Sequence, residues 1–329
     1  MKRIAAFAMV ITAIAVGLAM GLPMGHGFAQ DYPVRPIRIL SPYSPGGISD
    51  IAARIVAGKL TEAWGQQVIV ENRPGGNGFI AVTDAARAAP DGYTLVMVTA
   101  GDITINPSLF KTVPYDVDRD LAPVSAVNDA PLVLAANSET PYKTFADVIA
   151  AAKAQPGMLN IGSPGYGSIN HLVLESISLN TGTKFTHVPY KGGAPAVQAL
   201  VAGDIPLAII ASSTAAPHVA SGKIRILGVT TGERSPLNPE WPPLAQEGAG
   251  DINVSNWTAL LGPKAIPQPI IQKLSARVIE ILNMPDVKAR FAAGGVSTIP
   301  STPDELAARI KRELATYRGV IEKANVHID

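Results

Sequence analysis

Three glycine-containing turns hold the residues of this chain that are best suited to bind a small anion. They span residues 41–50, 160–171 and 188–195. Glycines in such turns let the backbone approach a ligand closely and take positive φ values. Where a helix follows the turn, its free N–H groups and its dipole favour a bound anion. The turns therefore predict an anion site made of main-chain groups, with a plain capped turn as the structural alternative.

Polar side chains in these turns can begin the helices that follow. Ser49 or Asp50 can cap a helix after the first turn, and Ser168 or Asn170 can open one after the second. In the third turn Tyr190 offers a hydroxyl and an apolar ring face, and the next residue is a lysine. That lysine is either a ligand contact or a solvated turn residue.

Two enzymatic interpretations of the second turn lack parts of their motifs. A dinucleotide-binding turn needs a third glycine, where Asn170 stands, and an acidic residue after the next strand. A hydrolase nucleophile elbow needs Gly-x-Ser-x-Gly, and here Gly162 stands directly before Ser163, without the intervening residue. His171 cannot be assigned as the base for that serine, and the scattered histidines show no metal-ligand spacing. We therefore expect no catalytic residue, no metal and no cofactor.

The elements that position the turns follow an alternating pattern of apolar runs and helical periodicity. Such alternation predicts an α/β fold with parallel sheets covered by helices. Expected strands cover residues 37–40, 68–70, 93–98, 131–136, 159–162, 185–188, 206–210, 224–229 and 254–261. Expected helices cover residues 48–64, 79–88, 267–283 and 303–324.

The rhythm breaks in residues 231–250, which are rich in proline and glycine and predict an irregular excursion. About 300 residues after the leader are too many for one ordinary core and suit two lobes. We expect residues 30–127 and 253–329 to form lobe 1 and residues 128–252 to form lobe 2. Two strands would then cross between the lobes and act as hinges.

The N-terminus has the three-part pattern of an export signal. Lys2 and Arg3 precede an uncharged run from Ile4 to Leu22, and Gly27-Phe28-Ala29 supplies small residues for cleavage. This predicts a signal peptide over residues 1–29, cleaved near Ala29, and a periplasmic mature protein. An uncleaved membrane anchor is the alternative, because the apolar run is just long enough to span a bilayer.

Composition excludes several classes of function. The chain has no cysteine, which rules out disulfides, thiol catalysis and lipidation at cysteine. Without residues 1–29 it has 25 basic and 26 acidic residues, and this balance lacks the excess of positive charge that is typical of nucleic-acid-binding proteins. Any anion specificity must therefore come from local groups.

Seven short segments occur in a fixed order along the chain. They are Ser44–Asp50, Glu71–Gly76, Ala89–Leu95, Gly162–Ser168, His171-Leu172, Val188–Gly192 and Ala220–Lys223. With these segments the chain resembles the Bordetella uptake gene (Bug) receptors, the extracytoplasmic solute receptors of tripartite tricarboxylate transporters. The similarity runs from about Tyr32 to the C-terminus. Each segment alone is weak evidence for this family, but seven segments in the same order are highly specific for it.

The resemblance implies a type II periplasmic-binding-protein fold, a Venus flytrap whose two lobes close on a ligand. In such receptors the first two turns face each other and hold one ligand carboxylate through backbone groups and two bridging waters. The resemblance implies a small organic acid as ligand, the membrane subunits of such a transporter as partners, and a monomer. The ligand-binding candidates that it gives are Tyr43, Ser44, Gly46, Gly47, Ile48, Asp50, Thr99, Ala100, Gly101, Asp102, Ser163, Gly165, Tyr166, Gly167, Ser168, His171, Tyr190, Ala211 and Ser212.

Asp102 stands where members of this family often carry small or hydroxyl residues. In the cleft it could receive an amino or amide group, or it could repel a second ligand carboxylate. It could also cap a helix before Ile103. Two other functions stay open at this point, a sensor receptor for a signalling kinase and, with less support, a hydrolase on the same scaffold.

Overall fold

The computed structural model describes residues 32–190, 192–235, 237–326 and 328. By its internal contacts the chain divides into Met1–Val34 and Arg35–Asp329, and the elements below belong to the second unit. The predicted signal peptide, residues 1–29, lies outside the described residues. A search of the described residues for a helix long and apolar enough to cross a membrane found none.

Three parallel strands begin the fold. β1 (Ile37–Ser41) lies between β2 (Val68–Asn72) and β3 (Thr94–Thr99). Parallel strands need crossover connections, and helices supply them: α2 (Ile48–Trp64) joins β1 to β2, and α3 (Phe79–Ala86) joins β2 to β3. β1 is buried at four of its five positions, as expected of a strand covered on both faces. We call these strands, with the partners described next, the first sheet region.

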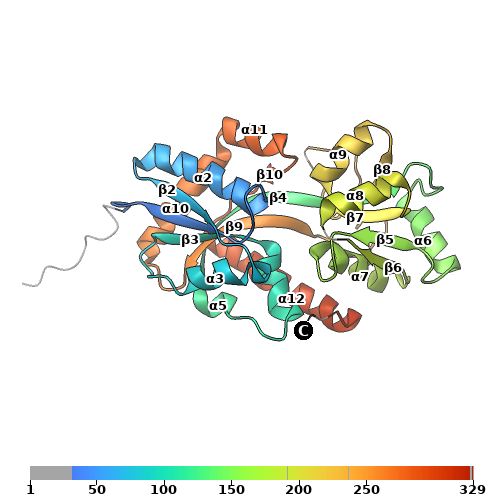
Figure 1. Ribbon diagram of the computed structural model, residues 1–329, viewed down its shortest axis with the longest axis horizontal. Coiled ribbons are helices and arrows are strands. Elements are labelled where there is room, and N and C mark those ends of the chain that lie inside the picture. The colour runs from blue at the N-terminus through green and yellow to red at the C-terminus, as the bar shows by residue number, and fades with distance from the viewer. Residues whose placement is uncertain (1–31, 191, 236, 327, 329) are drawn as a thin grey trace, which may run out of the picture. The chain divides into compact units, whose positions relative to one another are not determined.

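Two long strands leave the first sheet region. β9 (Ser255–Pro263) pairs antiparallel with β3 and with residues 121–131 of β4 (Leu121–Asn137). The short β10 (Ser297–Thr298) also pairs with β4. β4 then continues past this pairing, and its residues 132–137 pair with two other strands. β4 therefore belongs to both sheet regions, as Figure 1 shows.

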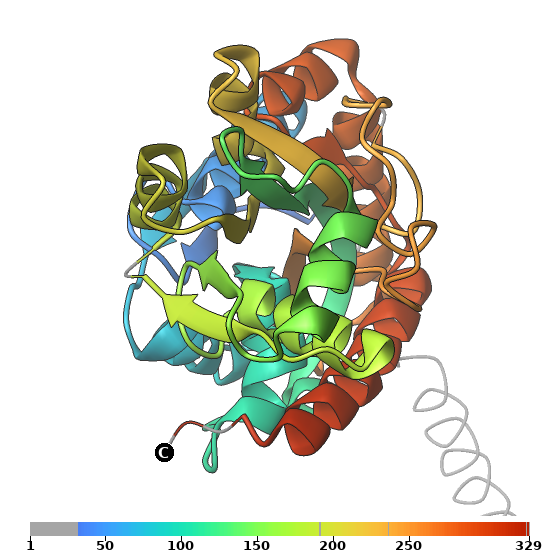
Figure 2. The same cartoon turned by 90° about the vertical axis from the view of Figure 1, so that its right-hand side faces the viewer.

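The second sheet region contains four further strands. β7 (Leu207–Ala211) and β8 (Ile224–Val229) pair antiparallel with the end of β4. β5 (Asn160–Ser163) lies parallel to both β7 and β6 (Thr186–Pro189). Figure 2 looks onto this region and shows helices on both sides of its strands. These helices are α6 (Phe145–Ala154), α7 (Ile169–Thr181), α8 (Gly193–Ala202) and α9 (Ser212–Ala220).

The C-terminal helices return to the first sheet region. α10 (Gln268–Asn283) packs against α2, and α11 (Pro285–Ala293) follows it. α12 (Pro303–Ala324) begins with a capping box in which Thr302 and Glu305 satisfy each other's backbone N–H groups. It packs against β4 and α7, so it touches elements of both sheet regions. The short elements are η1 (Gly76–Gly78), η2 (Gly101–Ile105), α4 (Asn106–Leu109) and α5 (Val117–Asp120).

The expected elements are present, with differences that have physical causes. The strand expected over residues 131–136 is the end of β4, which begins at Leu121. Pro123 and Pro131 interrupt the apolar pattern there, and the register of β4 shifts just after Pro123. The sequence pattern does not indicate α6, α8, α9 and α11, which are short and partly exposed. The described residues between 231 and 250 are irregular, as expected.

Candidate functional site

A cavity of about 360 Å³ lies between the two sheet regions, a size typical of sites for small molecules. One side is formed by the turn after β1, the end of β3, η2 and α4, and the other by the turn between β5 and α7. The lining residues are Tyr43, Asn77, Thr99, Gly101, Ile105, Asn106, Leu109, Pro164, Gly165, Tyr166, Gly167, Ser168, Ile169, Asn170, Asn256 and Ile328.

The turn between β5 and α7 lines this cavity with residues 164–168. Ser168 caps α7 by accepting a hydrogen bond from the backbone N–H of His171 (3.2 Å), and its own hydroxyl donates to the Gly165 carbonyl (2.7 Å). Gly167 has φ +72°, a conformation that L side chains rarely adopt. The first residues of α7, Ile169 and Asn170, also line the cavity, which places a helix N-terminus at its wall.

Two stacked histidines brace this turn from behind. The His171 and His187 rings lie 3.9 Å apart between centroids, with an angle of 11° between their planes. His171 Nδ1 accepts a hydrogen bond from the Gly167 N–H (3.1 Å), and His187 Nε2 lies 2.6 Å from Ser163 Oγ. Burial, together with the neighbouring His171 ring, lowers the pKa of His187 to about 4, so the ring is neutral near pH 7.

Ser163 therefore has a histidine neighbour that the sequence did not identify. His171 is eight residues away along the chain, whereas the contact is made by His187 on the adjacent strand β6. Ser163 is 1% exposed and does not line the cavity. Its hydroxyl also lies 3.1 Å from the Gly165 carbonyl and accepts from the Gly165 N–H (3.2 Å). These contacts fix the shape of the turn.

The turn after β1 is held by Asp50. Its carboxylate accepts from the Gly46 N–H (2.9 Å), the Arg54 side chain and the Asn72 amide (2.8 Å). Burial opposes ionisation, but these hydrogen bonds and the Arg54 charge outweigh it and lower the pKa of Asp50. Asp50 thus reaches back to fix the turn, and the expectation that Ser49 or Asp50 is the N-cap is wrong. The cap is Gly47, and the Ser49 hydroxyl lies 3.0 Å from that of Ser41.

Tyr43, Thr99 and Gly101 line the opposite wall, with Asp102 directly behind them. Asp102 is fully buried, and Oδ2 accepts from the Thr99 N–H (2.7 Å) and the Thr99 hydroxyl (2.9 Å). Oδ1 accepts from the Tyr43 hydroxyl (2.7 Å). The expectation that Asp102 caps a helix before Ile103 is wrong: the N-cap of η2 is Ala100, without a side-chain cap hydrogen bond, and the Asp102 carboxylate instead reaches back to Thr99. In the structure the Asp102 carboxylate is hydrogen-bonded to Tyr43 and Thr99. None of the alternatives drawn from the sequence included these protein partners.

The cavity brings together seven of the residues expected at the site. They are Tyr43, Thr99, Gly101, Gly165, Tyr166, Gly167 and Ser168. The others lie behind its wall or outside its lining: Ser44, Gly46, Gly47, Ile48, Asp50, Ala100, Asp102, Ser163, His171, Tyr190, Ala211 and Ser212. Tyr190 packs with the apolar core of the second sheet region, and Ala211 precedes α9, which begins at Ser212.

Amide side chains supply polar lining that the sequence did not point to. Asn77 has φ +49°, and its carbonyl accepts from the Asn106 side chain (2.8 Å). Asn256 comes from the crossing strand β9. Of the described residues that line the cavity, none is lysine or arginine. A bound anion would therefore meet neutral donors and a helix N-terminus.

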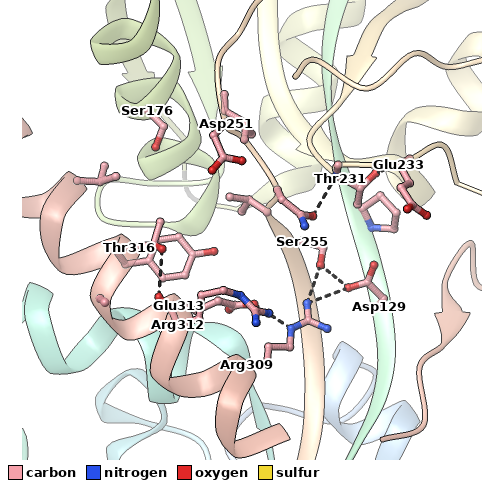
Figure 3. A pocket seen from close by; sticks show the side chains of 18 of the residues that line it. Asp129, Ser176, Thr231, Glu233, Asp251, Ser255, Arg309, Arg312, Glu313 and Thr316 are labelled. Carbon is pink, nitrogen blue, oxygen red and sulfur yellow. Dashed lines mark hydrogen bonds and ion pairs between the residues drawn. The ribbon is translucent and has the colours of Figure 1, made fainter. Parts of the chain in front are cut away.

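A larger hollow, of about 1050 Å³, lies on the other face of β9 (Figure 3). Ser255 lines this hollow and the next residue, Asn256, lines the smaller cavity, as the alternation of side chains along a strand requires. The charged side chains at the centre of the larger hollow are paired within the protein. Arg309 forms an ion pair with Glu313 (2.8 Å) and donates to Ser255, and the Ser255 hydroxyl donates to Asp129. We therefore take the smaller cavity as the candidate ligand site.

Comparison with known proteins identifies relatives along almost the whole chain. A family model described as the tripartite tricarboxylate transporter family receptor matches residues 52–326. Protein BugT of Bordetella pertussis is 35% identical over 301 residues, which cover 91% of this chain and 92% of that protein. A UPF0065 protein encoded in the tcbD–tcbE intergenic region of Pseudomonas sp. is 31% identical, with 94% and 93% covered.

Solved structures with the same fold include ligand complexes. A periplasmic transporter is 35% identical with a TM-score of 0.76, covering 91% of this chain and all of that one. Rpa4515 of R. palustris, solved with adipate, is 30% identical with a TM-score of 0.77, covering 90% and 99%. MatC of Rhodopseudomonas palustris, solved with bound malate, is 29% identical with a TM-score of 0.72, covering 88% and 100%.

Proposed function

Since the chain belongs to the tripartite tricarboxylate transporter family of receptors, we propose that it binds a small organic carboxylate in the cavity between the turn after β1 and the turn before α7. The family and the two-lobed periplasmic-binding fold, both predicted from the sequence, are confirmed by these comparisons. The identity of the acid and the residues that touch it belong to the proposal.

The observation that carries the proposal is the uncharged lining of this cavity. Residues 164–168 and the first turn of α7 line one side of it, and the uncharged residues Tyr43 and Thr99 line the other. Such a lining suits a carboxylate held by a helix N-terminus and by bridging waters. The adipate and malate complexes of two relatives support this ligand class.

We assign closure of the site to the crossing strands. Lobe 1 would comprise residues 30–127 and 253–329, and lobe 2 residues 128–252, with β4 and β9 as hinges. A ligand that contacts both walls binds the closed form more tightly and so shifts the population toward it. Trp257 lies on β9, next to the lining residue Asn256, and is fully buried. Its fluorescence should report on closure.

The remaining assignments follow from the family. The chain would be exported with residues 1–29 as a signal peptide cleaved near Ala29, would act as a monomer, and would deliver its ligand to the membrane subunits of a tripartite transporter. It would catalyse no reaction, since Ser163 is buried behind the turn.

Ligand binding by the purified mature protein tests the proposal. Thermal shift and tryptophan fluorescence are measured with mono- and dicarboxylates, amino acids, sugars and divalent cations. We expect saturable responses to one or more organic acids alone. The Gly101→Val variant places methyl groups at the cavity wall, where a Cβ would meet only Thr99 Oγ1 at 3.7 Å, and should abolish the response while the protein stays folded.

The matched control is Gly58→Val in α2, where a Cβ meets no atom within 4 Å. This variant should bind like the wild type. A response to sugars or cations and to no organic acid would contradict the proposed function, and normal binding by Gly101→Val would contradict the location of the site.

A further inference from the structure

The carboxylate of Asp102 is held by three uncharged donors behind the cavity wall. Its oxygens accept from the Tyr43 hydroxyl, the Thr99 N–H and the Thr99 hydroxyl, at 2.7, 2.7 and 2.9 Å. The side chain is completely buried, whereas Tyr43 and Thr99 themselves line the cavity. Asp102 therefore does not line the cavity and can act on a ligand through these two neighbours and through its charge.

An ionised carboxylate fixes the direction of both hydroxyl groups. A carboxylate can only accept hydrogen bonds, and each hydroxyl has one hydrogen to give. Because Tyr43 and Thr99 both donate to Asp102, only the lone pairs of their oxygens remain for a molecule in the cavity. Two residues that would otherwise be flexible donors thus become acceptors.

The packing around Asp102 keeps this arrangement in place. The Tyr115 hydroxyl donates to the backbone carbonyl of Asp102, and Thr104 Oγ1 donates to the Ala100 carbonyl (2.7 Å) within the same turn. On the other side Gly78 has φ +89°, and a Cβ at that position would overlap Asp102 Oδ1. The carboxylate has no room to turn away from Tyr43 and Thr99.

On the basis of the proposed function, we propose that Asp102 determines the ligand class by making the Tyr43–Thr99 wall an acceptor surface. The receptor then takes a carboxylate whose far end carries a hydrogen-bond donor, an ammonium, amide or hydroxyl group. A second ligand carboxylate at that wall would place its oxygens against the Tyr43 and Thr99 oxygens, which also only accept, and close to the buried charge of Asp102. The receptor therefore rejects a second carboxylate at this position. The acid held at the start of α7 is unaffected by this selection.

Matched acids test the inference by isothermal titration calorimetry at pH 7.5. The probes are ω-amino acids, which only donate at the far end, dicarboxylates, which only accept, and plain monocarboxylates, each with four to six carbons. We expect the best ω-amino acid to bind the wild type at least tenfold more tightly than the dicarboxylate of the same length.

The Asp102→Asn variant reverses the direction of one hydrogen bond. Its amide oxygen can still accept from Thr99, and its NH₂ group then donates to the Tyr43 oxygen, which frees the Tyr43 hydrogen for the cavity. The preference should therefore fall at least tenfold. Asp118→Asn, at an exposed position of α5, removes the same charge and should leave the preference unchanged.

Each outcome decides between the possibilities. A wild type that prefers the dicarboxylate, or equal preference in wild type and Asp102→Asn, overturns the inference and leaves the proposed function standing. Binding of no acid by the wild type overturns the proposed function and the inference with it. If Asp102→Asn does not fold, Tyr43→Phe decides: loss of the preference supports the inference, and an unchanged preference overturns it.

Discussion

The indole nitrogen of Trp257 donates to both carboxylate oxygens of Glu313, at 3.0 and 2.9 Å. This contact joins the crossing strand β9 to α12. Arg309 extends it, since its guanidinium lies over the Trp257 ring, pairs with Glu313 and bonds to Ser255 (3.2 Å). Asp129 on β4 accepts from Ser255, so one network fastens both crossing strands to α12. The two crossing strands thus have a polar support on the face away from the candidate site.

Removal of Glu313 should weaken this support. The Glu313→Ala variant removes the acceptor of the Trp257 N–H and the nearest ion-pair partner of Arg309, which should lower the free energy of unfolding by about 2 kcal/mol. Urea unfolding followed by tryptophan fluorescence measures the change. Glu322→Ala, at an exposed position of the same helix, should stay within about 0.5 kcal/mol of the wild type. Equal stability of the two variants would show that the network contributes nothing.

Stability should depend on pH through Asp102. Burial raises its pKa to about 6, above the usual 3.8, so the folded chain holds a proton there that the unfolded chain has lost. The stabilising effect of this proton is complete below pH 3.8 and is lost as the pH rises through 6, an effect of about 3 kcal/mol. Asp102→Asn cannot titrate. Its stability relative to the wild type should therefore rise between pH 4 and pH 7.5, and a constant difference in urea unfolding would argue against the shift.

The packing of Gly78 against Asp102 predicts a position-specific cost. Gly78→Ala adds a Cβ that overlaps the Asp102 carboxylate, at a backbone with φ +89°. Gly182→Ala is the matched control, because it shares a positive φ but meets no atom within 4 Å. The backbone strain of about 1 kcal/mol is common to both, and overlap in a packed site adds about 1–3 kcal/mol for Gly78 alone. Thermal unfolding of both proteins gives the difference, which should be close to zero if Asp102 can move.

His171 should act on binding through the turn that it supports. His171→Phe keeps an aromatic ring beside His187 but removes the acceptor of the Gly167 N–H, so ligand affinity should fall about tenfold. His171→Asn restores an acceptor at the position of Nδ1 and should recover part of the affinity. Calorimetric Kd values, with circular dichroism as the check on folding, distinguish this role from a general loss of structure. Equal affinities of the two variants would exclude it.

Much of the fold follows from local pattern. The helix that begins at Ile48 and the strand that begins at Ile37 were placed correctly, because apolar spacing along the chain decides which face an element buries. Two of the three glycine turns predicted from the sequence line the candidate site, and they need glycine at positions such as Gly46 and Gly167, which have positive φ. Short helices with weak periodicity, such as α11, carry too little signal for this kind of argument.

The sequence by itself therefore determined the family, the α/β architecture and the turns that form two walls of the candidate site. Only the tertiary structure decided what each polar group faces: Asp102 meets Tyr43, 59 residues away, and Ser163 meets His187 on a neighbouring strand. It also decided that Asn256, on the crossing strand β9, lines the cavity. Periodicity and turn chemistry act over a few residues, whereas these contacts depend on how distant elements pack. That packing fixes the direction of each hydrogen bond in the site.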